Sequence, residues 1–581
     1  MTAPPARPLT DALQPAKQSA RRHYGSHPYF TKRAWNVVQA YIEHFSSPGD
    51  TVLDPFGGSG VTAVESLVRR RKTVYVDISR WACFLARQTA IAPVSVAGLQ
   101  RAFEQVAHAC REEIERLWAR PDEALAAEPV PAWYPRGVPL PSNADVPWVH
   151  ELFTPRMLHG LARLRAGIMG FEDAPARDLL LMAFSATLAR INRTFLSANN
   201  RAESRGGSAI FSIYRYKIAA RAVALPLWDQ FEKRVQRLLA AKQETNELIG
   251  DFYREGDSAV FQHGSATRLL DWLKPGSVDY IYTDPPYGAH IAYRDLSTMW
   301  AAWLNLEVTA ADRAEEVIEG GELRKSREVY HHLLSKSLAQ MHEVLRSDGW
   351  MSLVFAHRDT TYWEALVDAC TRAGFRYVNT VVQPVGVVWS MHKKKNPLRV
   401  LSGELVLNFR KTSQPAAKSP TLKHRDVLQV VRTGCEAAIV ERIGATTEEI
   451  HHRIIPQLLE SHLLTTFSRA WGDITPLLQQ WFRFDRRRGC WFLRPENVSS
   501  SRVARARLAR YFAITFLAEC EDAGRAPTEH QVFAYVCDQL NGRGAISRDA
   551  LRRLLKRVAY STDDRHWRLA RAGGQREFAF Q

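Results

Sequence analysis

Apolar positions in the first part of the chain follow two periods, one typical of strands and one of helices. Residues 51–53 and 73–76 are short, mostly apolar runs of the kind found in buried strands, whereas Trp35–Phe45 and 61–69 carry apolar residues at helical spacing. The polar turn SSPGD joins the first helix to the first strand, and a glycine-rich turn joins that strand to the next helix. This alternation predicts the start of a βαβ-type sheet.

The rest of the chain divides into blocks by the same criterion. After a mainly helical stretch, strand–helix alternation returns, and the TSQPAAKSP segment then reads as a linker before a helical end. We therefore expect an α/β fold, a Rossmann-like doubly wound sheet with a helical insert and a mainly helical C-terminal domain. The expected boundaries are a flexible N-terminus at 1–22, the sheet domain at 23–93 and 256–411, the insert at 94–255, the linker at 412–420 and the C-terminal domain at 421–581.

Charge narrows the choice of partner. The 581 residues include 78 Lys and Arg against 61 Asp and Glu, a net charge of +17. Roughly half of this excess follows residue 412. A chain so basic is expected to bind a polyanion, nucleic acid first, although a solvated basic surface is the alternative.

Membrane and disulfide signals are weak in this sequence. No run approaches about 18 uninterrupted apolar residues, so we expect no membrane-spanning helix, and the first 22 residues have no apolar core for a signal peptide. The seven cysteines are widely spaced and form no CxxC pair. This argues against a zinc ribbon or a disulfide framework and favours a reducing cytoplasm.

A glycine-rich turn follows the first predicted strand and consists of Asp54, Pro55, Phe56, Gly57, Gly58, Ser59 and Gly60. Such a turn opens a ligand crevice at the strand's carboxyl end, where glycine lets the backbone approach a ligand closely. Gly58, Gly60 and Ala63 also match GxGxxA, and Asp77 stands where a ribose-binding acid is expected, which is a dinucleotide-binding pattern. No GK[ST] follows, so a Walker-type phosphate loop is unsupported.

A second motif, some 220 residues later, changes this interpretation. Residues 277–282 alternate like a strand and lead into Asp284, Pro285, Pro286 and Tyr287. Together with the glycine turn, and with HPYFTKRAW ahead of it, this tetrapeptide resembles the amino-methyltransferases of DNA that use S-adenosylmethionine. The resemblance covers residues 21–91 and 261–411. It implies S-adenosylmethionine as cofactor and the exocyclic amine of adenine or cytosine as target.

The tetrapeptide suits this chemistry. An exocyclic base amine is a poor nucleophile because its lone pair is delocalised into the ring, and acceptors for both of its N–H hydrogens favour a pyramidal nitrogen as the transition state forms. Asp284 offers a carboxylate acceptor and Pro285 a backbone carbonyl, whose direction the Pro285–Pro286 rings fix. Tyr287 offers a face for stacking, worth about 1–3 kcal/mol. The base must flip out of the duplex to reach them.

The resemblance also implies cofactor contacts. The turn from Asp54 to Gly60 would line the methionine portion, Asp77 would bind the ribose hydroxyls, and Ile78 could lie against adenine. Relatives place an acid beside adenine at the start of the next element. Ser265, followed by Ala266, stands there in this chain, which is a departure from the family pattern.

The segment before the turn matches the family region that closes over the methionine end of the cofactor. Its candidate residues are His27, Tyr29, Thr31 and Lys32. Lys32 could pair with the cofactor carboxylate, and a solvated lysine is the alternative.

Two regions are candidates for DNA contacts. The insert carries a glycine-flanked basic loop with Arg201, Arg205, Arg215 and Lys217, residue types that read base edges or grip phosphates, although a solvated loop is the alternative. Near the C-terminus, Ser547 can cap a basic helix over Arg548–Val558 that contains Arg552, Arg553 and Lys556. The order helix, turn, basic helix, strand resembles a winged-helix DNA binder, and a helical packing module is the alternative.

We expect a site-specific DNA amino-methyltransferase, with adenine N6 favoured over cytosine N4 because DPPY rather than SPPY is commoner among adenine enzymes. An RNA amino-methyltransferase would share these motifs, a NAD-linked oxidoreductase would leave the second motif unexplained, and a DNA-binding protein with an inactive site is the non-enzymatic alternative. No metal-ligand spacing and no nuclease or helicase signature is present. Any restriction or defence partner would therefore be a separate chain.

Overall fold

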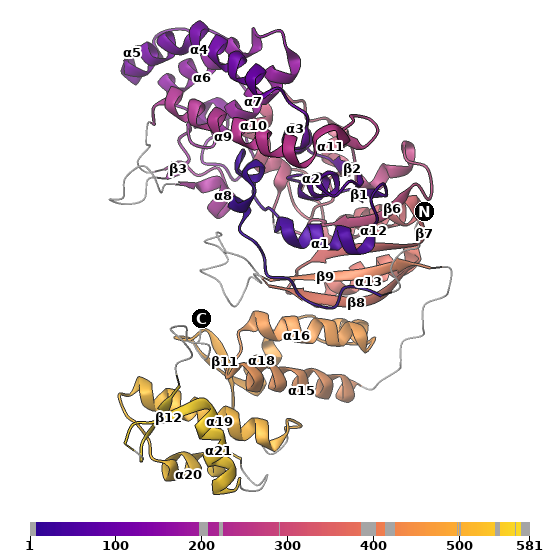
Figure 1. The fold of residues 1–581 in the computed structure, drawn as a ribbon, viewed down its shortest axis with the longest axis vertical. Coiled ribbons are helices and arrows are strands. Elements are labelled where there is room, and N and C mark those ends of the chain that lie inside the picture. Colours follow the sequence, from indigo (N-terminus) through magenta and orange to yellow (C-terminus); the bar gives the residue numbers. More distant parts are fainter. Residues whose placement is uncertain are drawn as a thin grey trace. The chain divides into compact units, whose positions relative to one another are not determined.

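The computed structural model of the protein forms two compact units (Figure 1). The first comprises Met1–Ala356, Ala365–Lys394 and Glu404–Ala416, and the second His357–Glu364, Lys395–Gly403 and Ala417–Gln581. Within them the structure describes residues 7–196, 207–219, 225–289, 291–384, 403–412, 424–494, 496, 498, 501–540, 546–563 and 565–570. Of the proposed DNA contacts, Arg201 and Arg205 lie outside these ranges.

A seven-stranded sheet organises the described part of the first unit. All its neighbouring strands run parallel except β9, which is antiparallel to both β7 and β8. The predicted α/β class is confirmed by this mostly parallel sheet and by the helices of the same unit. In spatial order the strands are β5 (Ala259–His263), β2 (Lys72–Asp77), β1 (Thr51–Asp54), β6 (Val278–Thr283), β7 (Leu345–Phe355), β9 (Glu404–Lys411) and β8 (Phe375–Gln383).

The chain winds outward from the middle of this sheet in both directions. From β1 it runs to β2 and β5 on one side, and it then returns to β6 and continues to β7 on the other side. The winding therefore reverses between β1 and β6, and a ligand crevice is expected at the carboxyl ends of strands at such a switch point. Buried apolar residues of α1 and α2, such as Val38, Tyr41 and Val64, pack with Val52 of β1 and Tyr280 of β6.

Helices surround the sheet and build the insert. The predicted helix Trp35–Phe45 has the expected bounds, and the one expected at 61–69 ends a residue earlier. The helices of the first unit are α1 (Trp35–Phe45), α2 (Val61–Val68), α3 (Arg80–Ala90), α4 (Val96–Ala119), α5 (Asp122–Ala126), α6 (Pro155–Met169), α7 (Ala174–Leu188), α8 (Ala209–Ile213), α9 (Leu227–Leu248), α10 (Tyr293–Trp303), α11 (Ala310–Glu315) and α12 (Arg327–Val344), and α13 (Thr360–Ala373) is divided between the two units. Short 3-10 helices are η1 (Gln18–Ala20), η2 (Arg22–Gly25), η3 (Val149–Leu152), η4 (Gly250–Phe252) and η5 (Ala266–Asp271), and a two-stranded pair is β3 (Phe195–Leu196) with β4 (Gly207–Ser208).

The insert shares a hydrophobic core with the sheet domain. Buried side chains of α4, α6, α7 and α9 pack in one cluster with residues of α3 and α10, including Trp81, Trp300 and Trp303. Trp300 stacks on Trp81 with ring centroids 5.2 Å apart, and its Nε1 donates to the carbonyl of Ser185 on α7 at 3.0 Å. The insert is therefore continuous with the packing around the sheet.

The N-terminal segment, expected to be flexible, makes defined contacts with the sheet domain. Asn36 Nδ2 donates to the Gln14 carbonyl at 2.8 Å, and Asn379 Nδ2 donates to the Leu9 carbonyl at 2.7 Å. A buried ion pair between His23 and Glu244 of α9, with 2.6 Å between Nδ1 and Oε2, ties the next residues to the insert. The approach to α1 is thus fixed on two sides.

The second unit is mainly helical in its described residues, as the sequence predicted. Thr446 and Thr528 form capping boxes before α16 and α20, and Ser547 caps α21 as expected. Its elements are α15 (His424–Arg442), α16 (Thr447–Glu460), α17 (Leu464–Ala470), α18 (Thr475–Trp481), α19 (Arg505–Asp522), α20 (Glu529–Gln539) and α21 (Arg548–Val558), with the hairpins β10 (Phe482–Asp485) with β11 (Cys490–Leu493) and β12 (Ala559–Ser561) with β13 (Trp567–Leu569). In the part of the chain that the structure describes, no helix combines the length and apolarity needed to cross a membrane.

We predict that Trp300→Ala lowers the free energy of unfolding by about 3–5 kcal/mol, because it leaves a cavity where α3, α7 and α10 meet. Trp300→Phe should cost less, since it keeps most of the ring volume. Urea denaturation followed by circular dichroism measures both. Trp272→Ala is the control, because that side chain is 38% exposed and should change stability little. Equal effects of Trp300→Ala and Trp272→Ala would contradict the shared core.

Candidate active site

The two sequence motifs meet at one edge of the sheet. β1 and β6 are parallel neighbours, with Val52 opposite Tyr280 and Leu53 opposite Ile281, so their carboxyl ends lie side by side. The Thr283 hydroxyl, at the end of β6, donates to Asp54 Oδ1 at the end of β1 over 3.1 Å. Residues more than two hundred positions apart are thereby joined directly at the switch point.

The glycine turn is closed by Asp77 at the end of β2. Asp77 Oδ2 accepts from the Gly58 amide and Oδ1 from the Ser79 amide, both at 2.8 Å, and burial raises the pKa of Asp77 to about 6. Gly60 has a φ of +78° and a Cβ there would lie 2.7 Å from Ala86 Cβ, so both conformation and space require glycine. The turn and the carboxylate thus form one rigid unit.

Residues of the N-terminal segment line a common pocket with the turn. His27, Tyr29, Lys32 and Ser59 all border it. Lys32 Nζ donates to the carbonyls of Tyr24 at 2.6 Å and His27 at 2.7 Å, and burial lowers the pKa of Lys32 to about 7. Its ammonium group therefore braces the segment itself in this structure.

The same segment contacts α10, α3 and α7 through hydroxyl groups and aromatic rings. The Thr31 and Tyr293 hydroxyls are 3.0 Å apart. Tyr29 stacks on Trp81 at 5.3 Å, and His27 Nε2 is 2.9 Å from the Ser185 hydroxyl. Residues 27–32 are therefore held between the insert and α10.

Asp284 has a hydrogen-bond donor on each carboxylate oxygen. Tyr287 donates its hydroxyl to Oδ1 at 2.6 Å, and Arg33 donates Nε to Oδ2 at 2.6 Å. A second guanidinium nitrogen of Arg33 donates to the Tyr287 hydroxyl at 2.6 Å, and a third pairs with Glu404 of β9. Arg33 and Glu404 were not singled out from the sequence, although Arg33 lies within the HPYFTKRAW segment.

Electrostatic effects at Asp284 oppose one another. Burial raises the pKa of Asp284, the Arg33 guanidinium opposes that rise, and the Glu404 carboxylate adds to it. Asp54, whose own pKa burial raises to about 7, is a further acid within electrostatic reach, as are the Tyr282 and Tyr293 hydroxyls. The charge state of Asp284 thus depends on the balance between the Arg33 cation and these neighbouring acids.

The rest of the tetrapeptide is also fixed. The Pro286 carbonyl accepts from the Tyr330 hydroxyl at 2.7 Å, and the Tyr287 ring meets Phe355 edge-on at 5.0 Å. No donor in the described part of the chain bonds to the Pro285 carbonyl. The loop therefore holds one carboxylate and one unused carbonyl in place beside an aromatic ring.

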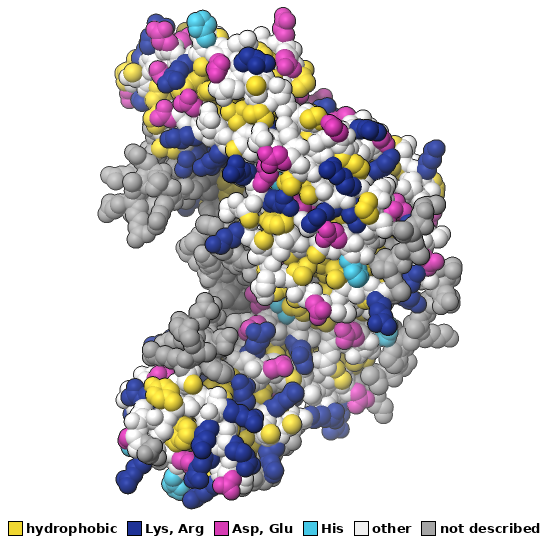
Figure 2. Space-filling view, in the orientation of Figure 1, with side chains coloured by type: hydrophobic (Ala, Val, Ile, Leu, Met, Phe, Trp, Pro, Cys, Tyr) yellow, Lys and Arg dark blue, Asp and Glu magenta, His cyan; other side chains and the backbone are white. Residues whose placement is uncertain are grey.

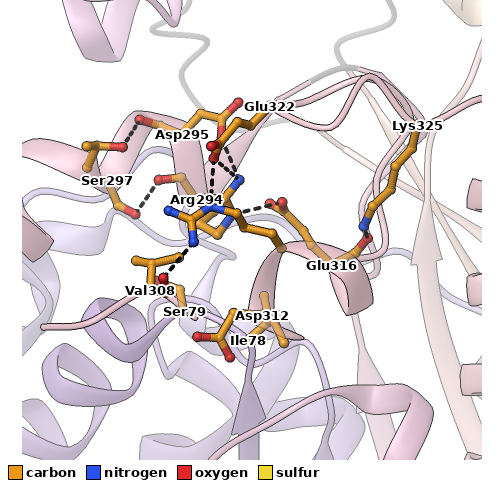
Figure 3. A network of polar contacts seen from close by, with 12 residues as sticks. Ile78, Ser79, Arg294, Asp295, Ser297, Val308, Asp312, Glu316, Glu322 and Lys325 are labelled. Atoms are coloured by element: carbon orange, nitrogen blue, oxygen red, sulfur yellow. Dashed lines mark hydrogen bonds and ion pairs between the residues drawn. The ribbon is translucent and has the colours of Figure 1, made fainter. Parts of the chain in front are cut away.

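An acid missed in the sequence lies near Ile78. Ser265 caps η5 by accepting from the Thr267 amide at 3.2 Å, and Ala266 begins that helix. Asp312 of α11 lies beside Ile78 (Figure 3), and its Oδ1 is 3.1 Å from His263 Nε2. Asp312 follows the second motif in sequence, so no local pattern connected it with this place.

A network of ion pairs holds α11 there (Figure 3). Arg294 donates to Glu316 at 3.1 Å and to Asp295 and Glu322 at 3.0 Å each. Its side chain is only 7% exposed, and the three carboxylates offset the cost of burying its charge. The network fixes the segment that carries Asp312 relative to α10.

The DNA-contact candidates that the structure describes are exposed. Arg215 pairs with Asp145 in the insert, and Lys217 is exposed beside it. In the second unit Arg552 pairs with Glu529 at 2.9 Å, and Arg553 and Lys556 are exposed on α21. Among the described residues no group of three or more His, Cys, Asp or Glu side chains is arranged to hold a metal ion.

Comparisons with known proteins converge on the first motif. The sequence profile of a DNA methylase family, N6/N4 methyltransferases, matches residues 6–88. The type II methyltransferase M.MjaII of Methanocaldococcus jannaschii is 31% identical over 70 residues, 12% of this chain and 13% of its own. YubD of Escherichia coli K12, which bears the name of a methylase, is 35% identical over 101 residues, 17% of this chain and 39% of its own. The chain thus spans well under half the length of these relatives.

A solved structure from Thermus thermophilus, named as a DNA modification methylase in complex with S-adenosyl-L-methionine, is 15% identical. It covers 28% of this chain and 57% of its own, with a TM-score of 0.16, which is too low to carry the assignment. The likeness to DNA methylases therefore rests on the sequence matches. The part of the chain that resembles the N6/N4 DNA methylase family, residues 6–88, contains the glycine turn.

Proposed function

We propose that this protein transfers a methyl group from S-adenosylmethionine to the exocyclic amine of a base flipped out of DNA, with adenine N6 as the favoured target and cytosine N4 as the alternative. One observation carries the proposal. The glycine turn and the Asp284 loop adjoin each other at the sheet's switch point, where the Thr283 hydroxyl bonds to Asp54. A cofactor crevice and a pair of amine acceptors thus share one edge.

The residues around the turn fit the cofactor's groups. Asp77 would accept hydrogen bonds from the ribose hydroxyls, and the turn would line the methionine portion. Ile78 would pack against adenine, with Asp312 supplying the acid that Ser265 lacks. When bound, S-adenosylmethionine supplies an electrophilic methyl group on its sulfonium.

The chain's own contribution to transfer is to hold acceptors for the amine. Asp284 would accept one N–H of the base and the Pro285 carbonyl the other, which localises the nitrogen lone pair as the transition state forms. Arg33 favours the ionised form of Asp284, because its guanidinium opposes the rise in pKa that burial and the neighbouring Glu404 cause. Tyr287 would lie against the base, which must leave the duplex to reach this site.

The alternative functions differ in whether they would use the Asp284 carboxylate and in whether they transfer a methyl group. An RNA amino-methyltransferase would use the same acceptors, and comparing duplex DNA with RNA in a tritium-transfer assay separates the two. A NAD-linked oxidoreductase would have no use for the Asp284 carboxylate beside the crevice. A protein with an inactive site would bind DNA without transfer. Any restriction or defence partner is proposed as a separate chain.

Asp284→Ala should lower the rate of methyl transfer by about 10²–10³-fold, because it removes one acceptor of the developing charge, while cofactor affinity stays unchanged. The measurement is tritium transfer to DNA, with calorimetry for the cofactor. Mass spectrometry of DNA from cells expressing the parent identifies N6-methyladenine or N4-methylcytosine. Asp257→Ala, which removes an exposed carboxylate, is the control. Transfer by Asp284→Ala at the parent's rate would refute the proposed role.

Asp77→Ala should weaken S-adenosylmethionine binding by about 10–100-fold, because the ribose hydroxyls lose a charged acceptor. Isothermal titration calorimetry measures the affinity directly. The turn could also rearrange, since Asp77 accepts the Gly58 amide. Asp77→Asn, which keeps one oxygen for that amide, should show a smaller loss, and unchanged binding by both variants would exclude Asp77 as a ribose contact.

Arg33→Met should move the acid limb of the pH–rate profile to higher pH. Asp284 must be ionised to accept an N–H, so activity is lost as the pH falls through its pKa, and removing the nearby cation raises that pKa. Arg33→Lys keeps the charge and should move the limb less. Glu404→Gln removes a like charge and should move the limb to lower pH. A limb in the same place in all three variants would contradict this role.

A further inference from the structure

The end of the second unit has the arrangement of a winged helix. Three helices, α19, α20 and α21, are followed directly by the hairpin of β12 and β13. Thr528, at the start of α20, forms a bridge with His566 beside the hairpin, and the Trp567 amide donates to the Pro527 carbonyl at 2.9 Å. The second and third helices and the wing therefore form one connected body.

The third helix, α21, separates apolar and basic side chains on two faces. Leu551, Leu555 and Val558 are buried against the rest of this body. Arg552, Arg553, Lys556 and Arg557 are all exposed. The apolar stripe packs the helix against this body, so most of the basic face is available for a partner.

Most of these cations have no counter-charge among the residues that the structure describes. Arg552 pairs with Glu529, whereas Arg553, Lys556 and Arg557 form no ion pair or side-chain hydrogen bond with any described residue. Between residues 546 and 570 the described residues include seven Lys and Arg against two Asp. Figure 2 shows Lys and Arg side chains gathering over the surface of these last helices.

We propose that α21 enters the major groove of duplex DNA, with the β12–β13 hairpin following the adjacent backbone. The major groove admits an α-helix, and the second helix of such a pair is the one that lies in it. The wing offers Arg565, Arg568 and the Tyr560 ring, which is 49% exposed, for phosphate and sugar contacts. This inference rests on the proposed function, because DNA is the substrate proposed there. It adds a DNA contact that lies outside the sheet domain.

One argument favours duplex DNA over duplex RNA as the partner, and a second favours α21 over the insert as the DNA contact. The major groove of duplex RNA is too deep and narrow for side chains to read, so a basic helix of this kind fits it poorly. In the insert, Arg215 is already paired with Asp145, and the insert helices are packed into the core beside the sheet. On α21, by contrast, Arg553, Lys556 and Arg557 form no ion pair with any described residue.

The test uses the full chain carrying Arg553→Ala, Lys556→Ala and Arg557→Ala together. We measure fluorescence anisotropy of a short labelled duplex DNA, and of a duplex RNA of the same sequence, over a series of salt concentrations. The triple variant should bind DNA about tenfold or more weakly, and the slope of log affinity against log salt should fall by about three. Each single variant should lower that slope by about one.

The control removes three exposed arginines from another helix, with Arg101→Ala, Arg111→Ala and Arg116→Ala on α4. Circular dichroism confirms that both variants fold. DNA affinity and salt slope unchanged in the α21 variant, an equal loss in the α4 variant, or equal binding of RNA by the parent would each overturn the proposal. At saturating DNA, the α21 variant should transfer methyl groups at the parent's rate. If the parent never methylates DNA, the proposed function is refuted, whereas the DNA-binding result remains valid.

Discussion

The parallel pairing of β1 with β6 is the constraint on which the candidate site depends. Each strand ends in a turn that by itself would not indicate a site. Strand pairing brings the two turns together, and the Thr283 hydroxyl donates a hydrogen bond to Asp54. The long insert between them in sequence has no effect on this distance, because the sheet and not the connection sets it. An α/β fold of this kind can therefore accept large insertions without losing its crevice.

Much of this arrangement could be predicted from the sequence, because local sequence patterns determine it. The short apolar runs, the glycine turn and the capping residues each act over a few positions, so the strands β1, β2 and β6 and the helix α21 lie where they were expected. Arg33, Glu404 and Asp312 were missed for the opposite reason. Their importance arises only when distant segments fold together, and Glu404 in particular carries no motif around it.

Lys32 was predicted to lie beside the turn, but its hydrogen-bond partners could not be predicted from the sequence. Its ammonium group bonds to two carbonyls of its own segment. Arg33, the next residue, reaches Asp284 instead. One segment thus borders the pocket beside the glycine turn and also bears the cation that bonds to Asp284. Ligands at the two places should influence each other's affinity reciprocally, as linkage requires.

The core shared by the insert and the sheet domain has a consequence for the family at large. Trp81 on α3 and Trp300 on α10 are covered by the helices of the insert. Cutting the chain down to its two motif-bearing parts would expose a broad apolar surface and promote aggregation. A compact relative without such helices must therefore bear polar residues at these two positions or shield them with a different segment.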